Sequence, residues 1–172
     1  KEAVDGAHRD GDSVGGVWVY TAETEDDPLG RTGPRIHSSL YASLRTNLPR
    51  DLMAFLDYPF DSTGGGSDDW PRFPGHACVR QYLENFARSF GIEPFIRFGT
   101  RVVCVEPGEG WVVESVAGTA VRREDFDAVA VCSGHYSEPR VPALPGAADF
   151  PGRLLHSHNY RDPGPFAGQR VA

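Results

Sequence analysis

Apolar residues recur at three- and four-residue spacing between His76 and Phe90. This spacing places them on one face of a helix, and Gly91 is typical of the position that follows a helix C-terminus. The sequence therefore predicts a helix over 76–90. A shorter helix is predicted over 50–55, because Pro49 suits the first position of a helix.

Short β-rich runs follow the longer helix, at 95–98, 101–106, 111–116 and 127–132. The Pro-Gly-Glu-Gly sequence at 107–110 predicts a hairpin between the second run and the third. Ala128–Cys132 is almost continuously apolar, which is typical of a parallel strand buried on both faces. A helix, a β-meander and a buried strand together predict an α/β fold with a layered sheet.

The remaining segments are richer in polar residues, glycine and proline. Surface loops are predicted over 1–14, 21–33 and 61–69, the last of which contains three consecutive glycines and is expected to be flexible. A Gly-Gly turn followed by a short strand is predicted over 14–20, and a further strand is expected to begin at 171–172. Pro139, Pro142 and Pro145 predict an extended linker.

Composition narrows the possible partners and compartment. The net charge of −7 over 172 residues argues against nucleic acid or an anionic membrane as the main partner. No apolar run is long enough to span a bilayer, and no signal peptide is visible. Cys78, Cys104 and Cys132 form no C-x-x-C pair and lie in apolar runs, so we expect buried free thiols in a reducing, cytoplasmic compartment, with a catalytic thiol as the alternative.

Motifs for the common catalytic and metal sites are missing from the sequence. There is no H-E-x-x-H, no Cys/His spacing typical of zinc, no nucleophile elbow and no G-x-G-x-x-G. We therefore expect no metal site.

One motif does point to a family. Phe150, Gly152, His156, Ser157 and Tyr160 form the pattern F-x-G-x-x-x-H-S-x-x-Y, which resembles the identifying motif of flavin-containing monooxygenases. In that family the motif connects the two cofactor domains. The resemblance implies that both aromatic residues pack as anchors, that the glycine allows a bend, and that His156 is structural. His158 falls outside the motif and is expected at the surface.

Other segments resemble the same family in the same order. Gly15-Gly16-Val17-Trp18 resembles its GG-x-W segment beside FAD, and 41–49 resembles its active-site segment, in which Asn47 would lie over the flavin ring. Thr100–Val103 resembles a strand on the adenine side of FAD, and 127–136 a buried strand that ends in a glycine turn. The implied cofactor-binding residues are Gly15, Gly16, Val17, Trp18, Arg45, Thr46, Asn47, Val103, Ser133 and Gly134, with Asn47 as the catalytic residue. Each segment taken alone is also compatible with an ordinary turn or strand, and for 15–18 and Asn47 that interpretation is the favoured one.

The resemblance also implies a domain organisation. It predicts a partial FAD-binding Rossmann-like domain over 1–138, lacking its first βαβ unit, then a linker over 139–149 and the start of an NADPH-binding domain over 150–172. Family members carry one G-x-G-x-x-G for each cofactor, and this chain carries neither. Glu2 is also a poor candidate for the acid that holds the FAD ribose. The isolated chain is therefore expected to bind FAD weakly or not at all.

The implied activity depends on FAD and NADPH. Family members form a C4a-hydroperoxyflavin with O₂ and oxygenate small molecules that carry a nucleophilic nitrogen or sulfur. The sequences of 41–49 and 134–139 most resemble those of plant members, some of which oxygenate thioethers. Two alternatives remain open. One is a truncated remnant that binds no cofactor; the other is a Baeyer–Villiger monooxygenase, whose similar motif usually ends in Trp where this chain has Tyr160.

Overall fold

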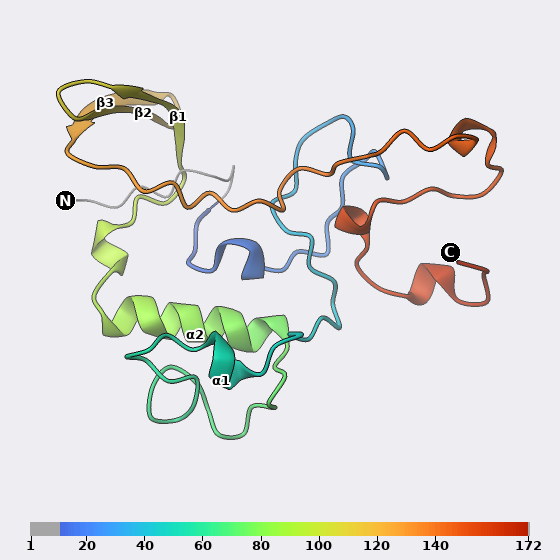
Figure 1. Cartoon of the computed structure of the whole chain (residues 1–172), viewed down its shortest axis with the longest axis horizontal. Coiled ribbons are helices and arrows are strands. Elements are labelled where there is room, and N and C mark those ends of the chain that lie inside the picture. Colours follow the sequence, from blue (N-terminus) through green and yellow to red (C-terminus); the bar gives the residue numbers. More distant parts are fainter. Residues whose placement is uncertain (1–10, 172) are drawn as a thin grey trace.

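The computed structural model describes residues 11–171, which form a three-stranded antiparallel sheet, two α-helices and long irregular segments. Figure 1 shows the sheet at one end, the helices along one side and the C-terminal segment at the other end. The predictions for residues 1–10, including Glu2, and for Ala172 lie outside the described residues. Among residues 11–171, no helix has the length and apolarity needed to cross a membrane.

The longer helix, α2, spans His76–Ser89 and confirms the predicted helix to within one residue. Gly91 has a φ of +61°, and its N–H donates to the Arg88 carbonyl while the N–H of Ile92 donates to the Ala87 carbonyl. This pair of bonds is a Schellman motif, which requires a residue in the left-handed conformation and so favours glycine. The shorter helix, α1, spans only Arg50–Met53 because Ala54 is already extended.

The apolar face of α2 forms a small aromatic core. Phe60, Val79 and Tyr82 are buried at its centre, and Phe60 stacks on Tyr82 with ring centroids 4.0 Å apart. The Tyr82 hydroxyl donates to the Tyr58 carbonyl at 2.6 Å and accepts from the Phe55 N–H at 2.9 Å, so its burial leaves no polar atom unpaired. Burial is the main cause of the raised pKa of Tyr82.

The glycine-rich segment 61–69 is a loop, as predicted, with Ser62, Thr63, Asp68 and Asp69 exposed, but its glycines pack against this core. A Cβ on Gly65 would lie 2.2 Å from the Tyr58 ring and 2.9 Å from the Tyr82 ring. The Gly65 carbonyl accepts a hydrogen bond from Asn85 on α2, and turns within the loop are closed by hydrogen bonds to the Asp61 and Asp68 carboxylates. A side chain at Gly65 would not fit against the aromatic rings, and side chains at Gly64 and Gly66 would overlap the backbone of Pro59 and Phe60.

The sheet contains β1 (Thr100–Pro107), β2 (Trp111–Ala117) and β3 (Ala120–Phe126), in that order. The predicted β-meander and its hairpin at 107–110 are confirmed. The strand β3 was not predicted, because its charged residues obscure the strand pattern. A two-residue turn at Gly118-Thr119, with Gly118 at a φ of +58°, is the signal that could have revealed it.

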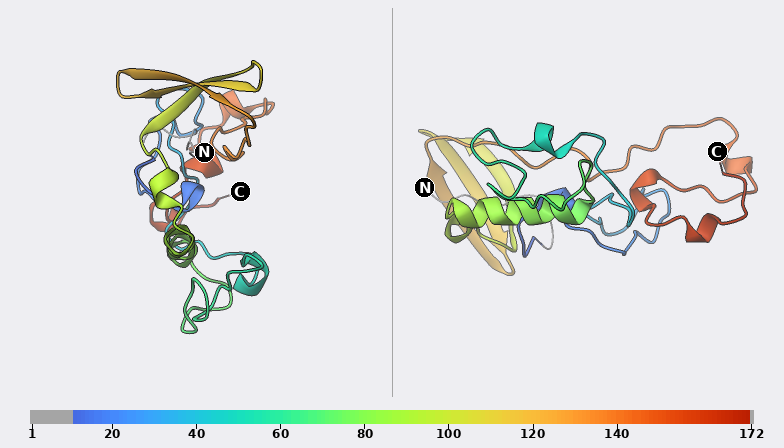
Figure 2. Two further views of the ribbon diagram at one scale, coloured as in Figure 1. Left: turned by 90° about the vertical axis from the view of Figure 1, so that its left-hand side faces the viewer. Right: turned by 90° about the horizontal axis from the view of Figure 1, so that it is seen from below.

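Three predicted strands are absent from the described residues. Residues 93–95 form the 3₁₀ turn η2 (Glu93–Phe95), so no strand covers 95–98. Residues 14–20 contain the 3₁₀ turn η1 (Gly16–Trp18) in place of a strand. Residues 127–132 run on from β3 as an extended, exposed segment, with Val131 78% exposed. Figures 1 and 2 show this segment leaving the sheet and crossing the molecule. An apolar run becomes a buried strand only where neighbouring strands bond to it, and no described strand does so here.

The cysteines are unpaired as predicted, but they are not buried. Cys104 and Cys132 are exposed and Cys78 is half-buried. Cys104 is exposed because its strand lies in a small sheet that other elements leave largely uncovered, and Cys132 because its segment is not part of the sheet.

Candidate cofactor site

Gly15 and Gly16 form a turn that packs on one side and is open on the other. Their φ angles are +130° and +52°, values that favour glycine. A Cβ on Gly15 would approach Val19 at 3.1 Å and Arg80 of α2 at 3.4 Å, whereas a Cβ on Gly16 would meet nothing within 4 Å. Trp18 anchors the turn by packing against the aromatic core. The backbone at Gly16 is therefore fixed in place yet accessible.

The chain around Ser38 links this turn to a second glycine turn. The Ser38 hydroxyl donates to the Val17 carbonyl at 2.9 Å, and the Ser39 hydroxyl donates to the Tyr136 carbonyl at 3.2 Å. Gly134 has a φ of +75°, and a Cβ there would meet nothing within 4 Å. The short segment of Ser38 and Ser39 thus lies between the predicted segments 15–18 and 133–134. Each of these two segments contains a glycine at which a side chain would meet no other atom within 4 Å.

Asn47 is held at the surface by its neighbours. The buried Thr46 donates its N–H to the Pro74 carbonyl at 2.9 Å and its hydroxyl to the Leu48 carbonyl at 2.7 Å. Arg45 pairs with Gly75 in an isolated bridge at the start of α2. The Asn47 side chain is exposed and has no hydrogen bond to residues 11–171, so its amide is available to a ligand.

Val103 occupies a β-bulge. The pairing of β1 with β2 skips from Val102 to Cys104, which leaves Val103 as the extra residue with a side chain 44% exposed. A bulge redirects one side chain and is common next to binding sites. Among the described residues, no hydrogen bond or ring contact joins Val103 or Asn47 to the two glycine turns.

The predicted motif at 150–160 packs through one aromatic residue. The Tyr160 ring lies 5.5 Å from that of Tyr41 and 6.0 Å from that of Phe166, in the 3₁₀ turn η5 (Gly164–Phe166). Phe150, which follows η3 (Ala147–Asp149), is 53% exposed, so its predicted role as an anchor is wrong. Its ring lies over its own chain at Gly152, where a Cβ would come within 2.5 Å of it.

His156 makes two hydrogen bonds within the described chain. Its N–H donates to the Pro28 carbonyl at 3.0 Å, and its Nδ1 accepts from the His158 N–H at 3.1 Å. Both bonds position the 3₁₀ turn η4 (Ser157–Asn159), at the start of which Ser157 is exposed.

The residues that follow form a buried polar cluster that the sequence analysis missed. His158 is 2% exposed and Arg161 6%, so the prediction of a surface His158 is wrong. Glu25 is also buried, although a surface loop was predicted over 21–33. Asn159 joins the two segments, because its Oδ1 accepts from the Glu25 N–H at 3.0 Å and its Nδ2 donates to the Asp27 and Pro28 carbonyls.

Arg161 fixes the cluster by donating to four carbonyl oxygens. Its Nε reaches Glu23 at 2.9 Å, its Nη2 reaches Ser38 at 2.9 Å, and its Nη1 reaches His158 and Tyr160 at 2.7 and 3.0 Å. The planar guanidinium matches several acceptors at once, which an ammonium group cannot do. The only hint in the sequence is the unbroken run of hydrogen-bonding side chains over 156–161.

His158 lies between Ser39 and Glu25. Its Nδ1 is 2.7 Å from the Ser39 hydroxyl, and its Nε2 is 3.3 Å from Glu25 Oε1 without the alignment of a hydrogen bond. Burial is the largest influence and lowers the pKa of His158; the Glu25 carboxylate opposes this shift, and the Arg161 charge adds to it. A neutral His158 therefore supports Ser39, whose hydroxyl contacts the Gly134 segment.

Comparisons with known proteins identify the family. A family model described as flavin-binding monooxygenase-like matches residues 6–172. The chain is 49% identical over 163 residues to the flavin-containing monooxygenase FMO GS-OX2 of Arabidopsis thaliana, covering 92% of this chain and 36% of the relative.

Solved structures give the same result. The S-allyl-L-cysteine S-oxygenase of Allium sativum matches with a TM-score of 0.82 at 48% identity, over 94% of this chain and 36% of that chain. Tmm from Pelagibacter sp. strain HTCC7211 matches with a TM-score of 0.75 at 31% identity, over 93% and 36%. This chain thus corresponds to about a third of the length of these proteins, and its fold is part of their Rossmann-like, cofactor-binding architecture. On the family match and these identities, the chain belongs to the flavin-binding monooxygenase-like family.

Proposed function

We propose that this chain is the central part of an FAD- and NADPH-dependent monooxygenase that oxygenates small molecules at a nucleophilic sulfur or nitrogen. The observation that carries the proposal is the pair of open glycine turns at Gly16 and Gly134, joined through Ser38 and Ser39. In a member of this family, two accessible stretches of backbone held on either side of one segment suit a long cofactor that must be approached closely.

The residues present fit FAD at this place. Residues 15–18 and 133–134 would hold it through backbone N–H groups, because a side chain at Gly16 or Gly134 would meet no atom within 4 Å and the backbone there is open to a close approach. Val103 would contact its adenine side. When bound and reduced by NADPH, FAD would activate O₂, so that one oxygen atom passes to the substrate and the other leaves as water.

Asn47, Arg45 and Thr46 would lie on the flavin and NADPH side. The exposed Asn47 amide can donate and accept hydrogen bonds without a change of charge near neutral pH, which suits a residue that positions a ligand. The buried hydrogen bonds of Thr46 keep the backbone of Asn47 in one place. Arg45, which is exposed beside it, adds a positive charge for an anionic cofactor group.

A thioether sulfur is the substrate atom that we favour. The support is the similarity to a protein named as an S-allyl-L-cysteine S-oxygenase, at 48% identity. We assign the protein to the cytoplasm because its three cysteines are unpaired. We also keep the division into an FAD-binding part over 1–138, a linker over 139–149 and the start of an NADPH-binding part over 150–172.

A chimera tests the proposal. Residues 15–171 would replace the matching segment of the Allium sativum S-oxygenase, and flavin absorbance, NADPH oxidation and sulfoxide formation would be measured. We expect a yellow protein that oxygenates S-allyl-L-cysteine. In the chimera, Asn47→Ala should retain flavin and lose at least about 100-fold in sulfoxide formation, as with loss of one well-placed polar group in an active site.

Leu48→Ala is the matched control, since Leu48 is a half-exposed neighbour that makes no side-chain hydrogen bond. It should leave activity within about threefold of the unmodified chimera. Full activity of the Asn47→Ala chimera would remove Asn47 from the mechanism. A chimera that folds but binds no flavin would favour the remnant, and oxygenation of a ketone in preference to a thioether would favour a Baeyer–Villiger enzyme.

A further inference from the structure

A separate polar cavity lies on one face of the β-sheet. It has a volume of about 350 Å³ and is lined by Arg97, Thr100, Ser115, Ala117, Ala120 and Arg122. This volume is near the small end of the range for ligand pockets, about 300 to 1,000 Å³. None of these residues belongs to the glycine turns or to the segment of Asn47; Thr100 begins β1, the strand that also contains Val103.

The register of the strands explains how the cavity forms. Ser115 pairs with Arg122 and Ala117 pairs with Ala120, so these side chains project from one face of β2 and β3. Thr100 joins them because it pairs with Ala117. The two alanines leave space between the longer side chains, which is why this face is hollow.

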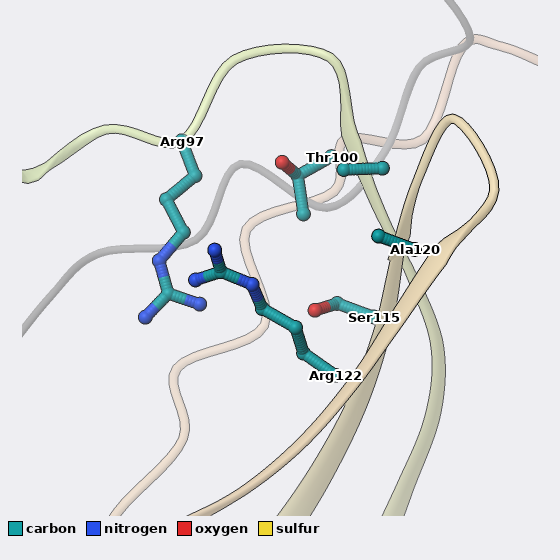
Figure 3. Close-up of a pocket in the computed structure, with 6 residues that line it drawn as sticks. Arg97, Thr100, Ser115, Ala120 and Arg122 are labelled. Carbon is teal, nitrogen blue, oxygen red and sulfur yellow. The ribbon is translucent and has the colours of Figure 1, made fainter.

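Positive charge and hydrogen-bond donors meet in this space. Figure 3 shows the guanidinium groups of Arg97 and Arg122 and the hydroxyl of Ser115 directed into the same cavity. Arg97 also binds the Glu124 carboxylate through two bonds of 2.5 and 3.0 Å, which accounts for one positive charge. Arg122 has no ion pair with any residue between 11 and 171, so the cavity keeps an excess positive charge on a chain of net charge −7.

Ser115 adds a neutral hydroxyl to the lining. The residue is 1% exposed, and no residue of the described chain accepts or donates a hydrogen bond at its hydroxyl, but this oxygen is not among the fully buried side-chain atoms that lack a partner. The hydroxyl is therefore open to the cavity. A ligand that accepts hydrogen bonds in the cavity would bind this hydroxyl and Arg122 together.

We propose that this cavity binds the phosphate group of a small molecule, held by Arg122 and Arg97 with the Ser115 hydroxyl as a further donor. Guanidinium groups match the geometry of phosphate oxygens and form short charge-assisted hydrogen bonds with them. An oxyanion also relieves the repulsion between two guanidinium groups that share one cavity. This site does not depend on the monooxygenase function, and failure of either proposal leaves the other unaffected.

The test is titration of the 172-residue chain with inorganic phosphate at constant ionic strength, followed by calorimetry and by ³¹P NMR. We expect saturable binding that Arg122→Gln weakens about tenfold or more, and that Ser115→Ala weakens severalfold. The matched control is Arg123→Gln. Arg123 is adjacent on the same strand, but it projects from the opposite face, where it pairs with Glu106 and Glu114. It should bind phosphate as the parent chain does.

Titrations with adenosine 5′-monophosphate and with adenosine show whether the site binds a nucleotide or the phosphate group alone. Tighter binding of the nucleotide than of inorganic phosphate assigns the site to a nucleotide, and equal binding assigns it to the phosphate group alone. The proposal is overturned if the parent chain shows no saturable phosphate binding, if Arg122→Gln and Arg123→Gln have equal effects, or if adenosine binds as well as its monophosphate. Circular dichroism of each variant shows that the sheet is retained.

Discussion

At the scale of single residues, Arg161 shows how a side chain outside any motif can organise a site. It joins residues 23, 38, 158 and 160 through their carbonyl oxygens and is itself almost fully buried. These bonds hold the segment of Ser38 and Ser39, whose hydroxyls bond to the segments of both glycine turns. The geometry of the candidate cofactor site therefore depends on a residue that does not touch the site.

Replacing Arg161 with Lys should destabilise the protein by about 2–4 kcal/mol, because a buried cation would lose most of its acceptors. The same change at Arg153, which is exposed and lies 5.8 Å from the Phe166 ring, should cost less than about 0.5 kcal/mol. Urea unfolding of both variants measures the difference. Equal effects would show that the four carbonyl contacts contribute nothing.

At the scale of elements, a segment can be predicted from the sequence when the residues that determine its structure lie close to it along the chain. The helix α2 and the hairpin at 107–110 are encoded by side chains within a few residues, and both were predicted. The strand expected over 127–132 depends on partner strands that its own sequence cannot specify. The polar cluster at 158–161 depends on the segment 23–38, more than 100 residues away, so its burial could not be seen in the sequence.

The candidate site shows the same contrast. Gly15, Gly16 and Gly134 were identified correctly as turns, because glycine at a positive φ leaves a signal in the sequence. The buried Glu25 and His158 left none, since an acidic residue in a turn-rich stretch and a histidine in a polar run both usually lie at the surface.

The glycine-rich loop over 61–69 allows a prediction about stability at the scale of elements. Gly65→Ala should destabilise the chain by about 1–3 kcal/mol, because the new methyl group would overlap the Tyr58 ring and displace it from the aromatic core. Gly75→Ala is the control: its Cβ would lie at an ordinary 3.6 Å from the Leu44 carbonyl, and its φ of −72° suits any residue. We expect a change well under 1 kcal/mol there. Thermal unfolding of the two variants distinguishes them.

At the scale of the whole molecule, stability should fall as the pH decreases from about 6.5, the ordinary pKa of histidine. The pKa of His158 is lower in the folded chain than in the unfolded chain, so the unfolded chain takes up a proton first. The stability that neutral His158 contributes is present above the unfolded pKa and is lost as the pH falls toward the folded value.

His158→Gln removes this titration, so its free energy of unfolding should vary less between pH 7 and 5 than that of the parent chain. Urea unfolding at several pH values tests the difference in slope. A variant with an unchanged slope would show that another group governs stability in this range.

The cluster around Arg161 also constrains the order in which the molecule assembles. The aromatic core joins residues 58–90, whereas Arg161 and Asn159 bond to residues 138 and 134 positions earlier in the chain. Contacts between nearby residues form before those that must close a long loop. During synthesis, the segment of Ser38 and Ser39 would acquire its final support only after residues up to Arg161 have been made, so the two glycine turns that it contacts would be the last part of the candidate site to reach their final positions.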